Sequence, residues 1–320
     1  MISRPEILAL AQRWMPNPPD ADTSRIVTDS TDFFQVQSGD ILLLQGHPYW
    51  IRNSVREGRF GLDDEVKHWV KRAIDLSSGA MKIIKLVFHE KFEANIGGIV
   101  FKCTRSPVKE ALILDLVNEH PHFMHGRTLT DEKANPVRIL DYIAGVTLAD
   151  HVADQKQDHE SYFHSVMPGV LANFIVCVEA IQFLHAGGQK HGDIRRDHIL
   201  IDADDGRYRW IDFDYSTESY ENIFGYDLFG LGNVLLYIVG KGDVLLQDIE
   251  RHAPAVLRTI VHDDLNIVVR NRLANLKLVY PYIPESLNRI LMHFSRGANW
   301  FYEYTHQLIS DLREAASRVR

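Results

Sequence analysis

The periodicity of the apolar residues changes once along the chain. From about residue 41 to 105 the apolar residues fall in short or alternating runs separated by Gly, Asp and Ser, which is typical of β-strands. Beyond residue 147 they recur at three-to-four spacing in long segments, which indicates amphipathic helices. A β-rich first half followed by a helical second half predicts an α+β fold with two lobes, and a cleft between lobes is a usual ligand site.

This pattern predicts three segments. Residues 1–40 form an N-terminal extension with a short helix and a linker rich in Pro and Asp. Residues 41–146 form the β-rich lobe, which also has one helix at about 107–118. Residues 147–320 form the mostly helical lobe. Its strongest predicted helices are 166–187, 226–240, 283–297 and 299–319.

The composition argues against several classes of protein. The chain has 320 residues, of which 45% are hydrophobic, and a formal charge of −8, which argues against wholesale nucleic-acid binding. No stretch approaches the roughly 20 uninterrupted apolar residues that a membrane helix needs, so we expect no membrane span and a cytoplasmic location. The only cysteines, Cys103 and Cys177, lie in apolar surroundings without metal-ligand spacing and are predicted to be buried thiols.

The segment 191–198, which reads HGDIRRDH, has the residues that phosphoryl transfer requires. Nineteen residues after Asp193 comes Asp212, with an apolar run in between. This arrangement resembles the catalytic loop and the metal-binding aspartate of the protein kinase-like superfamily. The resemblance implies that Asp193 accepts or orients the acceptor hydroxyl, that Arg195 neutralises the γ-phosphate, and that Asp212 binds Mg²⁺.

Other motifs resemble the same family in the same order, over about residues 48–315. Lys85, twelve residues after Ala73, resembles the lysine that holds the α- and β-phosphates of ATP, and Lys82 is the competing candidate. Glu110 resembles the helix glutamate that fixes this lysine. Without the resemblance, a glutamate in a first helical turn is simply a favourable partner for the helix dipole.

The resemblance continues through the hinge and the second lobe. Leu140 stands at the gatekeeper position. The residues whose main-chain groups would read the adenine edge are Asp141, Tyr142 and Ile143. Two further residues are implied to be structural: His191 in the catalytic loop, and Asp227, which opens a helix and would brace that loop from below.

The glycine-rich loop of the family is poorly matched. Gly58 and Gly61 are the candidates for cradling phosphates, but the loop is longer than usual. It is also acidic at Asp63, Asp64 and Glu65, and carboxylates repel phosphates. We expect these three residues to point outward, or to meet metal or substrate.

The activation segment is short. Gly192 replaces the arginine that pairs with a phosphorylated segment in many kinases, and only twelve residues separate Asp214 from Asp227. The sequence between them has no APE motif. Switching by loop phosphorylation is therefore not expected. Small-molecule kinases and several atypical kinases also have no such segment.

The metal site departs from the family pattern as well. His198 stands where kinases have asparagine, and Asp214 replaces the glycine of the DFG motif. Magnesium prefers oxygen ligands, so His198 as a ligand would weaken one metal position or favour Mn²⁺, and Asp214 could compensate. The alternative is that His198 only braces the loop by a hydrogen bond. The sequence leaves both interpretations open.

These features lead to one main hypothesis. The chain resembles an atypical, bacterial-type serine/threonine protein kinase of bilobal fold, with a small antiparallel β-rich lobe that includes one helix and a large helical lobe. It is expected to use ATP with Mg²⁺ or Mn²⁺ and to phosphorylate a hydroxyl, with protein Ser/Thr favoured over a small molecule. The alternatives are a small-molecule kinase and a pseudokinase that acts as a nucleotide-binding or scaffolding module.

Overall fold

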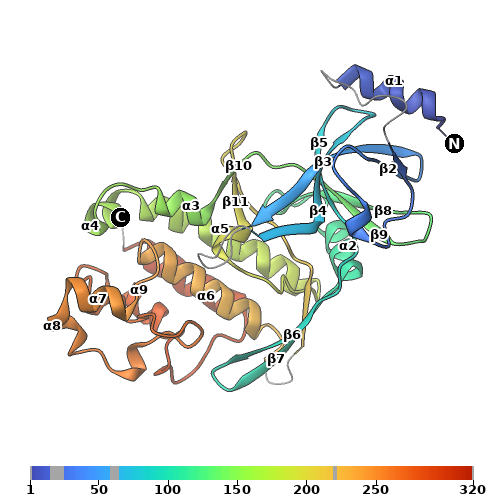
Figure 1. Ribbon diagram of the computed structural model, residues 1–320. Coiled ribbons are helices and arrows are strands. Elements are labelled where there is room, and N and C mark those ends of the chain that lie inside the picture. Colours follow the sequence, from blue (N-terminus) through green and yellow to red (C-terminus); the bar gives the residue numbers. More distant parts are fainter. Residues whose placement is uncertain (1, 15–24, 58–64, 219–221, 319–320) are drawn as a thin grey trace. The chain divides into compact units, whose positions relative to one another are not determined.

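The chain divides into two compact units (Figure 1). The structure is a computed structural model, and it describes residues 2–14, 25–57, 65–218 and 222–318. The first unit comprises residues 1–90, 105–119 and 124–142, and the second comprises 91–104, 120–123 and 143–320. The predicted division at 41–146 and 147–320 is coarser than this, because the segment 91–104 is grouped with the second unit.

The first unit is built on a seven-stranded sheet with the strand order β1-β2-β3-β4-β5-β9-β8. Its strands are β1 (Ile26–Val27), β2 (Ile41–Leu44), β3 (His47–Glu57), β4 (Glu65–Asp75), β5 (Met81–Lys85), β8 (Gly126–Thr130) and β9 (Pro136–Asp141). Neighbouring strands are antiparallel, except that β1 is parallel to β2. Antiparallel strands from a hairpin-rich segment are what the alternating apolar pattern predicts.

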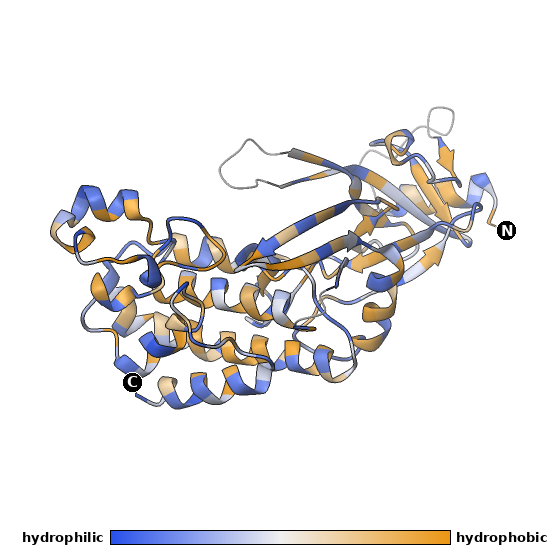
Figure 2. Cartoon of the chain, turned by 90° about the horizontal axis from the view of Figure 1, so that it is seen from below, coloured by the Kyte–Doolittle hydropathy of each residue, from blue (hydrophilic) through white to orange (hydrophobic). Residues whose placement is uncertain are grey.

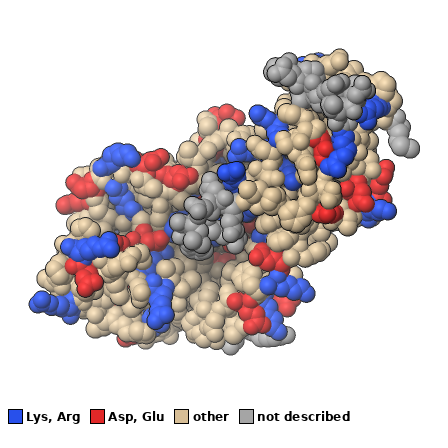
Figure 3. Space-filling model, viewed as in Figure 1, with Lys and Arg blue, Asp and Glu red and all other residues tan. Residues whose placement is uncertain are grey.

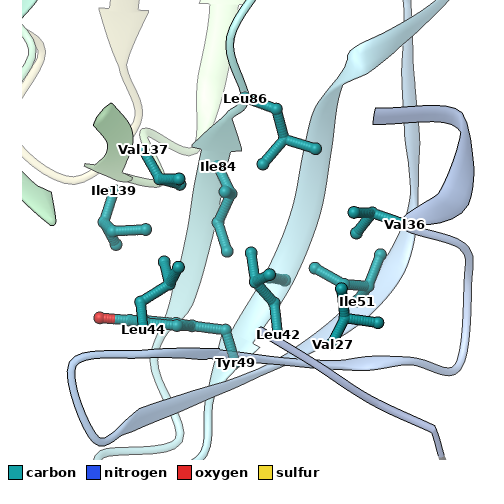
Figure 4. Packing of buried hydrophobic residues seen from close by; sticks show 11 residues of the cluster. Val27, Val36, Leu42, Leu44, Tyr49, Ile51, Ile84, Leu86, Val137 and Ile139 are labelled. Carbon is teal, nitrogen blue, oxygen red and sulfur yellow. The ribbon is translucent and has the colours of Figure 1, made fainter. Parts of the chain in front are cut away.

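The core of the first unit lies on one face of this sheet. Ile84 and Leu86 point into a cluster with Leu42, Ile51 and Val137, all of which are fully buried (Figure 4). Because side chains alternate along a strand, Lys85 between the two apolar residues is directed to the opposite face. The core packing of β5 therefore decides where the Lys85 ammonium goes.

Helix α2 (Pro107–Leu116) packs beside strands β8 and β9 (Figure 1). Its start is well defined, because the Ser106 hydroxyl accepts a hydrogen bond from the N–H of Lys109 and Pro107 occupies the first turn. Glu110, also in the first turn, is fully buried. The cap fixes the register of the helix, and with it the position of this carboxylate.

The N-terminal helix α1 (Arg4–Trp14) is part of the first unit. Its buried residues Ile7 and Ala11 pack against Ile41 of β2 and Leu76, which follows β4. The sequence predicted this helix but gave no role for it. In the structure it covers a second, smaller apolar cluster of the sheet.

The second unit is mostly helical, and hydrophilic residues cover the outer sides of its helices (Figure 2). Its helices are α3 (Leu148–Ala153), α4 (His159–Ser165), α5 (Met167–Ala186), α6 (Gly225–Val239), α7 (Leu246–His252), α8 (Pro254–Leu257), α9 (Glu285–Met292) and α10 (Thr305–Ala316). Helix α5 packs against α4, α6 and α10. Gly187 and Gly240 follow α5 and α6 as their C-caps.

Helix α5 is the one described helix that is long and apolar enough to cross a membrane by length and composition. Of its apolar window, 56% is buried within the protein. The central helix of a folded unit passes the same test, and α5 packs against helices on several sides.

Helix α10 is shorter than predicted. It begins at Thr305 rather than 299 because the Gln307 side-chain oxygen accepts hydrogen bonds from the N–H groups of Glu303 and Tyr304, which caps the helix there. The preceding aromatic residues Trp300 and Tyr302 instead pack around His293.

Two small sheets complete the second unit. One has the order β10-β11-β12, with β10 (Gly145–Thr147), β11 (Ile199–Asp202) and β12 (Tyr208–Trp210). The other has the order β13-β7-β6, with β6 (Lys91–Ile96), β7 (Ile99–Arg105) and β13 (Tyr215–Glu218). Strands β6 and β7 thus form a hairpin that pairs with the strand directly after the predicted metal-binding aspartates.

The hairpin has one apolar face. Phe101 and Cys103 are buried, whereas Val100 and Lys102, the neighbours on either side of Phe101, are exposed. The Phe101 ring lies 5.3 Å from that of Tyr226 and 6.5 Å from that of Phe229, both in α6. In Figure 1 the hairpin lies at the N-terminal end of α6. The hairpin is therefore fixed to the second unit by its inward side chains.

Candidate active site

The first unit contains a buried ion pair between Lys85 and Glu110. The Lys85 Nζ donates to Glu110 Oε1 at 2.7 Å, and the side chains are 4% and 0% exposed. This geometry favours Lys85 over Lys82 as the functional lysine. Lys82, near the start of β5, is only half-buried, and its Nζ pairs with the exposed Asp141 carboxylate at 2.5 Å.

The predicted hinge residues end the first unit and begin the second. Leu140 is buried, whereas Asp141 and Tyr142 are exposed. The Asp141 N–H already donates to the His125 oxygen within the first unit. Ile143 is half-buried and opens the second unit.

The predicted phosphate loop lies outside the described residues. Gly58 and Gly61 belong to this part of the chain, as do Asp63 and Asp64. Glu65 opens β4. The expectation that these carboxylates point away from phosphates stays a prediction.

In the second unit, Asp227 holds the main chain of the predicted catalytic loop. Its carboxylate accepts hydrogen bonds from the N–H groups of His191 and Gly192, both at 2.8 Å, and from His185 Nε2 at 3.0 Å. Burial alone would raise the pKa of Asp227, but the hydrogen bonds from His185 and Gly192 and the nearby histidine charges lower it to about 2. Asp227 is thus an ionised carboxylate at the base of the loop, where the sequence placed it.

Gly192 has a backbone φ of 85°. Residues with a Cβ avoid this region, so glycine fits the turn better than the arginine of many kinases would. The main chain of His191 and Gly192 can then present both N–H groups to Asp227.

Asp193 and Asp212 both approach His198. The Asp193 Oδ2 lies 3.5 Å from His198 Nδ1, and the Asp212 Oδ2 lies 3.6 Å from His198 Nε2. His198 is 2% exposed, whereas both carboxylates retain some exposure. Burial raises the pKa of Asp193 above its usual value, and the neighbouring His198 and Arg195 offset this rise only in part. A raised pKa suits a carboxylate that must accept a proton near neutral pH.

Arg195 is held beside these carboxylates. Its guanidinium donates to both carboxylate oxygens of Asp197, and its Nη2 lies 3.0 Å from His198 Nε2. A cation near the transferred group is what the sequence predicted for position 195, and the pairing with Asp197 fixes its orientation.

Asp212 has a left-handed backbone, with φ of 62°. Asp tolerates this conformation better than most residues, and such strained positions concentrate at functional sites. Asp214, two residues on, is 2% exposed. Among the described residues no group of three or more His, Cys, Asp or Glu side chains is arranged to hold a metal ion. The assignment of Asp212, Asp214 and His198 as metal ligands stays a prediction.

Arg138 is a charged residue of this region that the sequence did not reveal. It lies in β9 between the buried residues Val137 and Ile139, and its Nε donates to Glu110 Oε2 at 3.1 Å. An arginine within an apolar strand was the available signal. Its position opposite Lys85, and so beside Glu110, became visible only once the register of β9 against β5 was known.

The curated proteins that this chain resembles include serine/threonine-protein kinases. No protein-family model matches the chain. The serine/threonine-protein kinase RAD53 of Saccharomyces cerevisiae is 24% identical over 136 residues, which are 42% of this chain and 15% of RAD53. The probable serine/threonine-protein kinase KIN1 homolog of Encephalitozoon cuniculi is 24% identical over 147 residues, which are 45% of this chain and 24% of that protein. The chain thus spans less than a quarter of these curated relatives.

Among solved structures, a mutant form of the kinase domain of Mycobacterium tuberculosis PknI matches with a TM-score of 0.52 and 15% identity. The match covers 88% of this chain and 99% of that domain. The fold is therefore the bilobal protein kinase fold, with a β-sheet unit and a helical unit. Together with the curated relatives, this fold supports a member of the protein kinase-like superfamily.

Proposed function

We propose that the chain is an ATP-dependent phosphotransferase that moves the γ-phosphoryl group of ATP to a hydroxyl. The observation that carries the proposal is that Asp193 and Asp212 both lie within 3.6 Å of the buried His198 ring, on a loop held by Asp227. Phosphoryl transfer needs a base beside the acceptor and a carboxylate for metal, and these two residues supply both.

Each group has a distinct role in the proposed reaction. Asp193 takes the proton of the acceptor hydroxyl while the oxygen of that hydroxyl forms a bond to the γ-phosphorus of ATP. The bond between the γ-phosphorus and the oxygen that bridges it to the β-phosphate breaks, and ADP is released. Lys85, held by Glu110, binds the nucleotide phosphates. Arg195 offsets negative charge on the transferred group.

The residues present fit a magnesium ion in part. Asp212 offers carboxylate oxygens, the donors that Mg²⁺ prefers, and its side chain is 18% exposed. Both ring nitrogens of His198 already have partners in the loop, so Asp212 is the better candidate for holding the ion together with the ATP phosphates. When bound, the ion neutralises charge on the phosphate oxygens.

The favoured acceptor is a serine or threonine hydroxyl of a protein. The relatives RAD53 and the KIN1 homolog are named serine/threonine-protein kinases. On the face shown in Figure 3, basic and acidic side chains of the described residues are interspersed, in keeping with a net charge of −8. This surface gives no reason to propose a nucleic-acid partner.

The proposal is tested with the purified chain, labelled ATP, and either Mg²⁺ or Mn²⁺. We expect autophosphorylation, transfer to a generic protein acceptor or slow ATP hydrolysis in the wild type, and none in Asp212→Ala. Asp204→Ala, which removes an exposed carboxylate from the turn between β11 and β12, is the matched control and should behave as the wild type. Equal rates in the wild type and Asp212→Ala would refute the proposal.

A further inference from the structure

Two buried cations share the Glu110 carboxylate. Lys85 and Arg138 are directly opposite one another on the antiparallel strands β5 and β9, and like charges in such a pair repel. Glu110 of α2 bridges them: Oε1 accepts from Lys85 Nζ at 2.7 Å and Oε2 accepts from Arg138 Nε at 3.1 Å. None of the three side chains is more than 4% exposed. One carboxylate thus serves two cations.

Arg138 is fixed by the protein at every nitrogen. Besides the bond from Nε to Glu110, Nη1 donates to the Pro136 oxygen at 2.7 Å and Nη2 donates to the Leu86 oxygen at 3.0 Å. The guanidinium therefore ties β9, the end of β5 and the first turn of α2 together. A planar guanidinium held this way orients its carboxylate partner closely.

Lys85 differs from Arg138 in how its hydrogen-bond donors are used. An ammonium has three donors, and Glu110 takes one of them. If Lys85 were the sole cation for Glu110, engaging a phosphate would compete with a buried carboxylate that cannot be left unpaired cheaply. With Arg138 present, Glu110 keeps a charged partner whatever Lys85 does.

We propose that Arg138 is a positioning residue of phosphoryl transfer. It holds Glu110, and through Glu110 the helix α2 and the Lys85 ammonium, in place before any nucleotide binds. It also lets Lys85 turn to the phosphates without stripping Glu110 of its counter-charge. The proposal rests on the proposed function, in which Lys85 binds the phosphates of ATP.

The kinetic test compares Arg138→Met and Arg138→Lys with the wild type. In Arg138→Met the pull of Glu110 on Lys85 competes with phosphate, so we expect the KM for ATP to rise about tenfold, which corresponds to about 1.4 kcal/mol. The kcat should change much less. Arg138→Lys keeps the charge and should restore part of the KM. Arg127→Met on the neighbouring strand β8 is the matched control, since Arg127 bonds to the Tyr49 hydroxyl and not to Glu110.

A second test needs no enzymatic activity. Lys85→Met leaves Glu110 paired with Arg138, and Arg138→Met leaves it paired with Lys85, so each single variant should stay folded. The double variant leaves Glu110 buried without a cation, and its thermal midpoint should fall by more than the two single shifts added together. Glu110→Gln introduced into the double variant should recover most of that loss, because it removes the unpaired charge.

The outcomes separate this proposal from the proposed function. An unchanged KM for ATP in Arg138→Met, or strictly additive thermal shifts in the double variant, would overturn the positioning role and leave the kinase proposal standing. A lower thermal midpoint of Arg138→Met with an unchanged KM for ATP would show that Arg138 is purely structural, and this result would also overturn the positioning role. Inactivity of the wild type would refute the proposed function, while the thermal cycle would still report whether Glu110 is shared.

Discussion

His198 Nδ1 donates a hydrogen bond to the main-chain oxygen of Asp193, and the two atoms lie 2.8 Å apart. A carbonyl oxygen can only accept, so this nitrogen carries the proton in the arrangement that satisfies both groups. The other nitrogen, Nε2, then accepts from Arg195 Nη2 at 3.0 Å. Of the two interpretations that the sequence left open, this geometry favours a histidine that braces the loop over one that ligates metal.

The brace makes a specific prediction for His198→Asn. The shorter Asn side chain cannot donate to the Asp193 oxygen and accept from Arg195 at the same time, as the two ring nitrogens of His198 do, so we expect kcat to fall about tenfold, as for the loss of one charge-assisted hydrogen bond. The ratio of activities with Mg²⁺ and Mn²⁺ should stay within about twofold of the wild type, because no metal ligand has changed. Steady-state rates with each metal measure both quantities. His164→Asn, an exposed histidine of α4, is the control. A switch of metal preference in His198→Asn would instead make the histidine a ligand.

Gly192 allows a prediction about the missing arginine. Gly192→Arg restores the residue found in many kinases, but at φ of 85° any side chain adds strain of about 1–2 kcal/mol. We therefore expect a less stable protein with no gain in activity, measured by denaturant unfolding and by phosphoryl transfer. Gly169→Ala in α5 is the matched control, since the added Cβ meets nothing within 4 Å and alanine favours a helix. An activated Gly192→Arg would contradict this explanation.

The site residues that could be identified from the sequence are those that belong to short motifs with characteristic spacing. Asp193, Asp212 and Asp227 follow one another in a short stretch with apolar runs between them, and this order carried the resemblance to a kinase site. Lys85 could be preferred over Lys82 because Ile83 and Ile84 fill the two places before it, as in the VAIK motif of kinases, and the run from Ile84 to Leu86 suits a strand that passes through a core. The ion pair with Glu110 agrees with that preference.

The features that the sequence missed depend on contacts between distant segments. Arg138 acquires its role only from the register that sets it opposite Lys85. The apolar pattern up to about residue 105 predicted short strands, but the apolar face of the strand at 99–105 could not be assigned, because its partners Tyr226 and Phe229 lie more than a hundred residues further along the chain. A periodic pattern shows that a strand has a buried face and does not show what covers it.

The hairpin gives a prediction that tests its attachment to the second unit. Phe101→Ala removes a ring that is 1% exposed and packs against Tyr226 and Phe229, so we expect a loss of about 3–5 kcal/mol in the free energy of unfolding. Val100→Ala, the neighbouring residue on the outer face at 45% exposure, should cost less than about 0.5 kcal/mol.

Hydrogen exchange adds a local readout to this pair of variants. Strand β13 pairs with β7, so the amides of residues 215–218 should exchange faster in Phe101→Ala than in the wild type. Their exchange rate in Val100→Ala should equal that of the wild type. Equal exchange in both variants would mean that the hairpin does not hold the strand after Asp214.

His159 makes the stability depend on pH. Its Nε2 donates to the Val239 oxygen at 2.9 Å, its Nδ1 lies 2.6 Å from the Tyr282 hydroxyl, and its ring stacks on Tyr280 with centroids 3.4 Å apart. Burial lowers the pKa of His159 from 6.5 to about 4 in the folded chain. The unfolded chain therefore binds a proton below pH 6.5 that the folded chain does not bind until about pH 4.

The stability that neutral His159 contributes is thus complete above pH 6.5 and is lost as the pH falls towards 4, with no further loss from this group below that value. Because the ring is only partly buried, we expect this loss to be at most about 2 kcal/mol. His159→Phe keeps the stacking on Tyr280 and removes the titration, so its unfolding free energy should fall less between pH 7 and 4. Burial also lowers the pKa of His293, but that residue is common to both proteins and cancels in the difference. Parallel stability curves for the two proteins would show that His159 is not the group responsible.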